Sequence, residues 1–153
     1  MVHVEAGTNE ALVEVVENLR DDDVREFLAL AVYDSADLLR VDLLCRYANR
    51  HDTYAAFDDD KAVAFGALVE VSTEVMVAGF FATDRFAAIA LPVARFIKRR
   101  LLPTFRDRSI RCAILEDHVS AIGFVKVLGF HQEAGVYRVG KHGEAFCKFV
   151  WGG

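Results

Sequence analysis

The stretch that decides the fold is DHVSAIGFVKVLGF, which spans residues 117–130. An apolar run at 112–115 precedes it, and its first two residues, Asp117 and His118, give a polar start to a run of helix-compatible residues. Gly129 follows the last apolar position, where glycine commonly ends a helix because it adopts left-handed backbone angles without strain. The pattern therefore predicts a strand over 110–115, a helix over 119–128 and a new strand after Gly129.

Length and composition predict one folded domain over residues 1–153. The chain is 54% hydrophobic, which argues against disorder, and its length permits a sizeable core. Three scattered cysteines lack the spacing of a zinc site or a disulfide framework, so we expect reduced thiols. The sequence shows no charged-then-apolar leader and no apolar run long enough to span a bilayer. A cytoplasmic protein without a membrane partner is the resulting expectation.

The charge of the chain argues against nucleic acid as a partner, because the formal net charge is −5. Positive charge nevertheless gathers locally, in Arg95, Lys98, Arg99, Arg100, Arg106, Arg108 and Arg111. Such a cluster fits either a phosphate-binding patch or a solvated helix face, and the sequence leaves both alternatives open. Nucleic-acid binding is therefore only a third hypothesis.

The hydrophobic pattern predicts the remaining elements in order along the chain. We expect a strand over 2–6, helices over 9–20, after 21–23 and over 35–47, a hairpin of 53–57 with 62–69, a strand over 75–82, a helix around 92–102, and a terminal hairpin of 136–139 with 145–151. This order predicts an α/β fold with a mixed, mostly antiparallel sheet and helices on both faces.

Several local signals refine the helix boundaries. Thr8 is a good cap for the first helix, and either Ser35 or Asp37 opens the third. The acidic run 21–23 is interpreted as a cap that favours the helix dipole, in preference to a metal site. Pro92 suits the first turn of its helix, where no backbone donor is needed.

The chain resembles GNAT N-acetyltransferases over nearly its whole length. Residues 121–130, AIGFVKVLGF, are similar to the family's helix of the form Ala-Ile-x-Phe-Tyr-x-x-Leu-Gly-Phe. A closer resemblance is to small GNAT-like proteins of short-tailed bacteriophages, some of them internal virion proteins. It is carried by Asn18-Leu19-Arg20 with Glu26, by residues 81–84 and by residues 151–153.

The resemblance implies acetyl-CoA as cofactor. In the family a Gln/Arg-x-x-Gly-x-Gly/Ala loop at a helix N-terminus holds the pyrophosphate. Residues 84–92 take its place here and contain no glycine, so we expect weakened or altered binding. By the resemblance, Phe81, Ala82 and Thr83 lie beside the pantetheine arm, which would pair with the backbone of Phe81 and Thr83. The resemblance places Ala87, Ala88, Ile89 and Ala90 beside the phosphates. Arg85, or Arg95 on the following helix, either touches a phosphate or is a simple surface charge.

The resemblance also indicates where catalytic groups belong. The family's acidic tyrosine is Val125 here, which cannot donate a proton, and the asparagine that often opens the same helix is His118. His118 could act as acid or base, or only make a local hydrogen bond at the helix start. Glu70 and Glu116 are candidate bases, with solvated or ion-paired carboxylates as the alternative. No spacing of histidines indicates a metal site.

Two functions follow from these observations. The leading hypothesis is transfer of an acetyl group from acetyl-CoA to an amine on a protein or small molecule. It requires two splayed parallel strands that leave an open slot, not filled by Phe86 or another bulky group. The alternative is a catalytically degenerate binding protein that acts on a host protein or packs inside a virion. The apolar composition also permits a homodimer through the C-terminal hairpin.

Overall fold

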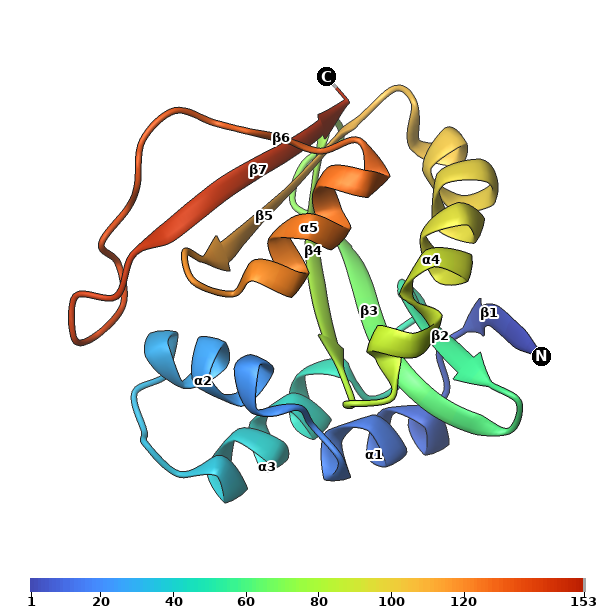
Figure 1. Ribbon diagram of the computed structural model, residues 1–153, viewed down its shortest axis with the longest axis horizontal. Helices are drawn as coiled ribbons and strands as arrows, with labels where there is room; N and C mark the ends of the chain where they lie inside the picture. Colours follow the sequence, from blue (N-terminus) through green and yellow to red (C-terminus); the bar gives the residue numbers. More distant parts are fainter. Residues whose placement is uncertain (153) are drawn as a thin grey trace.

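The computed structural model describes residues 1–152 as one seven-stranded sheet with helices on both faces (Figure 1). The strand order is β1-β2-β3-β4-β5-β7-β6, and every neighbouring pair is antiparallel except β4 with β5. The predicted α/β class and mixed, mostly antiparallel sheet are confirmed. The strands are β1 (Val2–Ala6), β2 (Thr53–Asp58), β3 (Lys61–Glu70), β4 (Val75–Ala82), β5 (Ser109–Leu115), β6 (His131–Gln132) and β7 (Phe146–Gly152).

Five α-helices cover this sheet within the described residues. They are α1 (Asn9–Glu17), α2 (Asp21–Leu30), α3 (Ala36–Tyr47), α4 (Phe86–Phe96) and α5 (Val119–Leu128). A π-helical turn, η1 (Ile97–Leu101), and a 3-10 turn, η2 (Leu102–Phe105), continue α4. None of the helices in residues 1–152 is long and apolar enough to cross a membrane.

The helices pack in two layers. On one face α1 and α3 bury Leu12, Val15 and Leu43 against Phe65 and Phe81 of the sheet. Helix α2 lies on this face too, where Ala29 packs on Leu115 and Phe146. On the other face α4 and α5 bury side chains such as Ala94 and Leu128 against Ile110, Ile114 and Phe149.

The deciding stretch folds as predicted. Strand β5 ends at Leu115, α5 spans Val119–Leu128, and Gly129 adopts φ 100° directly after the helix. The N–H of Gly129 donates to the Lys126 carbonyl and that of Phe130 to the Val125 carbonyl, both at 3.0 Å. These bonds satisfy helix-end carbonyls that would otherwise lack a donor.

The start of α4 differs from the prediction. The helix begins at Phe86, so Pro92 lies in its interior and not in its first turn. The earlier start allows Phe86, Ile89 and Val93 to be buried along one stripe. Pro92 lies on the exposed side of the helix. Proline has no N–H to donate, and the carbonyl one turn earlier that would have accepted this bond is open to water instead.

The acidic run 21–23 does not act as a cap. These residues form the first turn of α2 itself, and the residue before them, Arg20, makes no side-chain cap bond. Asp23 is buried and is used elsewhere, as described below. The predicted caps of the other helices are confirmed: Thr8 accepts from the Ala11 N–H at 3.1 Å and Ser35 from the Leu38 N–H at 3.3 Å.

The predicted C-terminal hairpin is largely wrong. Strand β7 pairs with β5 on one side and with the short β6 on the other. Residues 136–139 contribute only one bridge, Tyr137 to Phe146. Gly135 and Gly143 have positive φ, which interrupts an extended path, and Val136 and Val139 are exposed. The segment is therefore a loop over the edge of the sheet.

The parallel pair β4 and β5 separates along its length. Their register covers only Val75 with Ser109, Met76 with Ile110, and Val77 with Arg111. Beyond Arg111, β5 continues its pairing with β7, and beyond Val77, β4 continues with β3. The carboxyl ends of β4 and β5 therefore splay apart, as the transferase hypothesis requires, and leave a slot that we call the strand gap.

Two glycines of the deciding stretch provide a matched test of the helix end. Gly129→Ala should lower the free energy of unfolding by about 1 kcal/mol, because alanine is strained at positive φ. Gly123 is an exposed interior position of α5 where an added Cβ meets nothing within 4 Å. Gly123→Ala should therefore raise the same free energy by about 0.5–1 kcal/mol. Denaturant unfolding that gives both variants the same sign would contradict this account.

Candidate functional site

At the end of β4 that borders the strand gap, the chain itself bonds the backbone of Ala82. The N–H of Ala82 donates to Asp23 Oδ2 at 2.7 Å, and its carbonyl accepts from the Arg20 N–H at 3.0 Å. Leu19 forms a bridge to Thr83 beside them. The segment between α1 and α2 therefore pairs with the end of β4, and both backbone groups with which Ala82 faces the gap are used.

The β5 side is occupied in the same way. The N–H of Leu115 donates to Glu26 Oε2 at 3.3 Å, and its carbonyl accepts from the His118 N–H at 2.9 Å. Asp23 and Glu26 are three residues apart on α2 and so lie on one side of the helix. One face of α2 thus supplies a carboxylate to each of the two separated strands.

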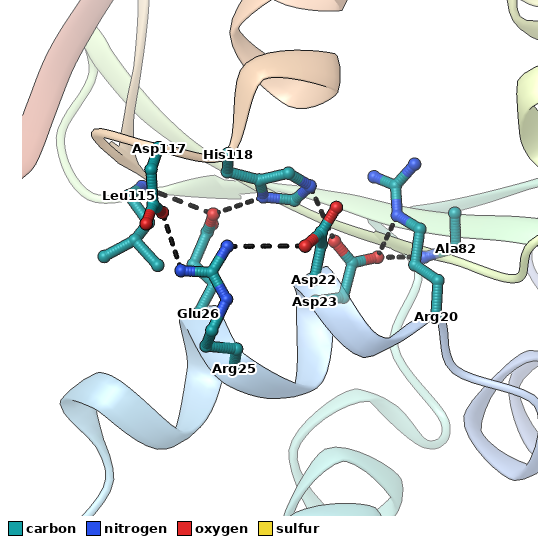
Figure 2. A network of polar contacts seen from close by, with 9 residues as sticks. All are labelled: Arg20, Asp22, Asp23, Arg25, Glu26, Ala82, Leu115, Asp117 and His118. Atoms are coloured by element: carbon teal, nitrogen blue, oxygen red, sulfur yellow. Dashed lines mark hydrogen bonds and ion pairs between the residues drawn. The ribbon is translucent and has the colours of Figure 1, made fainter.

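His118 joins the two carboxylates (Figure 2). Its side chain is only 1% exposed; Nδ1 lies 2.6 Å from Glu26 Oε2, and Nε2 lies 3.5 Å from Asp23 Oδ1. Within residues 1–152, His118 Nε2 is the single buried side-chain nitrogen or oxygen without a hydrogen-bond partner. The side chain makes no cap bond at the start of α5, so the interpretation as a local hydrogen bond is wrong.

The side chains of Arg20, Asp23, His118 and Glu26 form one continuous network of polar contacts. Arg20 Nε donates to Asp23 Oδ2 at 2.9 Å, and both side chains are largely buried. Burial raises the pKa of the Asp23 carboxyl above its usual range, although Arg20 acts in the opposite direction. At the exposed rim, Arg25 bonds Asp117 at 2.6 Å and so adds a second tie between α2 and the start of α5.

An apolar cavity of about 160 Å³ lies behind the network, between the sheet and helices α4 and α5. Phe80, Phe86 and Phe124 line it, and their ring centroids lie 5.2–5.4 Å apart. Its volume is below the roughly 300 Å³ at which small-molecule pockets usually begin. Cys112 also lines the cavity, and burial raises the pKa of its thiol to about 12, so it is no nucleophile at neutral pH.

The backbone groups expected to bind a pantetheine arm do not fit that role in this arrangement. The Thr83 N–H donates to the Val63 carbonyl of β3 at 2.9 Å, and Phe81, two residues earlier on β4, faces β3 in the same way. Ala82 does face the gap, but its groups are taken by Asp23 and Arg20.

The expected phosphate-binding residues lie around the start of α4. Ala87 and Ala88 are exposed, Ala90 is half-buried and Ile89 is buried. Among residues 1–152 no acceptor bonds the N–H groups of Ala87 and Ala88. Arg85 Nη2 lies 3.5 Å from Asp58 Oδ2 of β2, and both groups remain open to solvent. The helix start thus keeps free donors, but its arginine already has a carboxylate partner.

The three candidate catalytic residues do not come together. Glu70 ends β3 beside the start of β4, at the paired end of β4 and β5, and lies 3.4 Å from Arg108. His118 lies at the opposite, splayed end. Glu116 is exposed, and its N–H donates to the Ala145 carbonyl. Two other residues, Asp23 and Glu26, contact His118. Neither was selected from the sequence as a candidate catalytic residue. Their spacing of three residues on one helix was the signal that could have indicated them.

No metal site is indicated. Within residues 1–152 no group of three or more histidine, cysteine, aspartate or glutamate side chains could hold an ion. The three cysteines are free.

Comparison with known proteins defines the fold. No protein-family model matches the sequence, and no curated protein matches it significantly. An N-acetyltransferase from Staphylococcus aureus Mu50 superposes with a TM-score of 0.63 at 15% identity, over 99% of this chain and 97% of that one. The GNAT domain of PAT from S. lividans gives 0.64 at 16% identity, over 98% and 90%. A spermidine N-acetyltransferase from Vibrio cholerae gives 0.63 at 12% identity, over 98% and 92%.

These similarities show that the chain has the fold of GNAT N-acetyltransferases. Similarity at such low identity establishes the fold alone, because activity depends on the site that the fold carries. The closer resemblance to phage proteins rests on short sequence motifs and stays a prediction.

The burial of Asp23 can be tested by the pH dependence of thermal stability. The raised pKa means that folded Asp23 keeps its proton to higher pH than the unfolded chain does. Its contribution to stability is therefore present at acid pH and is lost as the pH rises through the folded-state pKa. The asparagine in Asp23→Asn does not ionise, so the variant does not lose stability in this way. The Tm of the variant minus the Tm of wild type should therefore increase from about pH 4 to pH 7.

Asp22→Asn is the matched control for this series. Asp22 is the neighbouring residue of α2, but its side chain is 56% exposed. Its Tm difference from wild type should stay nearly constant over the same range. A flat or falling difference for Asp23→Asn would show that Asp23 is not held as a buried carboxyl.

Proposed function

We propose that this chain is a GNAT-fold binding protein whose strand gap is closed by its own α2, and that it does not transfer acetyl groups. The observation that carries the proposal is the double use of Ala82, whose N–H and carbonyl are held by Asp23 and Arg20. A pantetheine arm that pairs with the backbone of Ala82 would have to displace the α1–α2 segment.

Displacement is energetically costly. It would remove the acceptor of the Ala82 amide, and it would separate Glu26 from Leu115 and His118. Breaking a buried ion pair by removing one partner costs about 3–5 kcal/mol. A cofactor that must first open such a network loses about two to four orders of magnitude in affinity. The absent loop glycines and Val125 in place of tyrosine support the same function.

Acetyl transfer to an amine of a protein or small molecule is the second candidate. It is favoured by the Glu26–His118 pair, since a carboxylate that holds one imidazole nitrogen leaves the other to act as a base. The free N–H groups of Ala87 and Ala88 would suit a phosphate. Glu70 and Glu116 are the other candidate acid or base groups of this second function.

The biological setting is part of the proposal. The sequence motifs shared with phage proteins suggest a phage-encoded chain that acts in the host cytoplasm or inside the virion. The partner of the binding function would then be a host protein, a virion component or a second copy of this chain. These assignments rest on the motifs at residues 18–26, 81–84 and 151–153.

A calorimetric titration with acetyl-CoA tests the proposal. We expect no measurable heat of binding up to about millimolar ligand, the range in which binding free energy falls near 4 kcal/mol. A GNAT enzyme that binds acetyl-CoA serves as positive control in the same buffer. In parallel, hydrogen exchange of the Ala82 and Leu115 amides should be slow and unaffected by acetyl-CoA, because both amides are bonded to α2.

Saturable 1:1 binding, together with faster or altered exchange at Ala82, would overturn the proposal in favour of acetyl transfer. Turnover could then be assigned with His118→Gln and Glu70→Gln. Loss of rate only in the first variant would place the chemistry at the α2 network, since Glu70 lies at the other end of β4.

A further inference from the structure

One stretch of the surface differs in charge from the rest of the chain. The sequence has 23 acidic and 18 basic residues, yet none of the acidic ones lies between Asp84 and Asp107. Within this stretch, five basic side chains of α4, η1 and the residue after η2 are exposed. We call them the cationic face; they are Arg95, Lys98, Arg99, Arg100 and Arg106.

The cationic face also differs from the preceding part of the chain in its ion pairs. Every arginine earlier in the chain has a carboxylate within 4.0 Å: Arg20, Arg25, Arg40, Arg46, Arg50 and Arg85. Among residues 1–152, no carboxylate pairs with any residue of the cationic face. An acidic protein thus keeps one surface without counter-ions of its own, and an external anion would meet little competition there.

The local backbone directs these side chains outward. Ala94 and Leu102 are buried, and Ile97 and Leu101 are half-buried, so one side of α4 and η1 faces the core. The residues between them are exposed. Cations at a helix C-terminus are favoured by the helix dipole, which explains why they are tolerated there. The dipole does not explain Arg106, or the absence of acidic residues over the whole stretch.

An exposed aromatic ring lies within the cationic face. Phe96 is 37% exposed although it is apolar, and it is the last residue of α4, directly after Arg95 and three residues before Arg99 of η1. Four of the five cations are arginines, whose guanidinium groups bind phosphate with two parallel hydrogen bonds. Phosphate contacts combined with an aromatic ring for base stacking are typical of proteins that bind single-stranded nucleic acid. An acidic protein segment would use the cations but not the ring.

We propose that the cationic face and Phe96 bind single-stranded nucleic acid, with the cations on phosphates and Phe96 stacked on a base. The net charge of −5 argued against such a partner, but it is a sum over the whole chain, and the cationic face is locally positive. This surface lies on the opposite side of the sheet from α2. The inference therefore does not depend on whether the strand gap is closed.

Fluorescence anisotropy with a labelled oligothymidine or oligouridine of about fifteen nucleotides tests the inference. The logarithm of the binding constant should fall linearly with the logarithm of salt concentration, with a slope of about −0.7 for each phosphate contact. Arg99→Ala with Arg100→Ala should make the slope less steep by about 1.4. Arg40→Ala with Arg46→Ala, on α3, is the matched control and should change neither slope nor affinity.

Phe96→Ala separates stacking from charge. It should weaken binding about tenfold and leave the salt slope unchanged, because it removes a stacked base and no phosphate contact. The proposal is overturned if wild type shows no binding at about 50 mM salt, or if the α3 control loses as much as the cationic-face variant. Equal displacement of the oligonucleotide by polyglutamate would overturn it in favour of an acidic protein partner. The result of the acetyl-CoA titration, with or without binding, does not affect the interpretation of these nucleic-acid experiments.

Discussion

Two carboxylates on one face of α2 hold together the place where the sheet opens. When β4 and β5 separate, the backbone groups of Ala82 and Leu115 lose the partners that a continuous sheet would supply. A buried N–H without an acceptor costs about 1–3 kcal/mol, so the divergence needs acceptors from elsewhere. Asp23 and Glu26 provide them, and Arg20 offsets the cost of burying the Asp23 charge.

The same requirement explains how a fold can persist while its chemistry changes. A splayed strand pair creates exposed edges, and any group with the right polarity can satisfy them, whether it belongs to a ligand or to the chain. Here the chain does so through α2, and the aromatic rings of Phe80, Phe86 and Phe124 pack behind it. Glu70, Arg85 and Glu116 then lie on the surface at separate places, without a shared reacting centre. The overall arrangement of helices and strands is unaffected.

Most of the fold was predictable because it is encoded locally. Thr8, Ser35 and Gly129 mark helix ends through contacts with residues three or four positions away. The hydrophobic pattern, with Gly129 as a helix stop, predicted the observed bounds of β4 and α5. The site was not predictable in this way. Asp23 meets Ala82 across 59 residues, and His118 meets Glu26 across 92. An aspartate in the first turn of a helix has the same local pattern whether it stabilises the helix end or reaches across to another strand.

The π-helical turn η1 has a consequence for how this protein can change over evolutionary time. A π turn closes its hydrogen bond over one more residue than an α turn, so it behaves like an α-helix that has absorbed an insertion. Loss of one residue from 97–101 would therefore return this turn to α geometry and keep Phe96 and the buried Leu102 in nearly the same orientation. Substitutions at Lys98, Arg99 or Arg100 can be accommodated one at a time. The segment can thus lose one residue without disturbing the packing on either side of it.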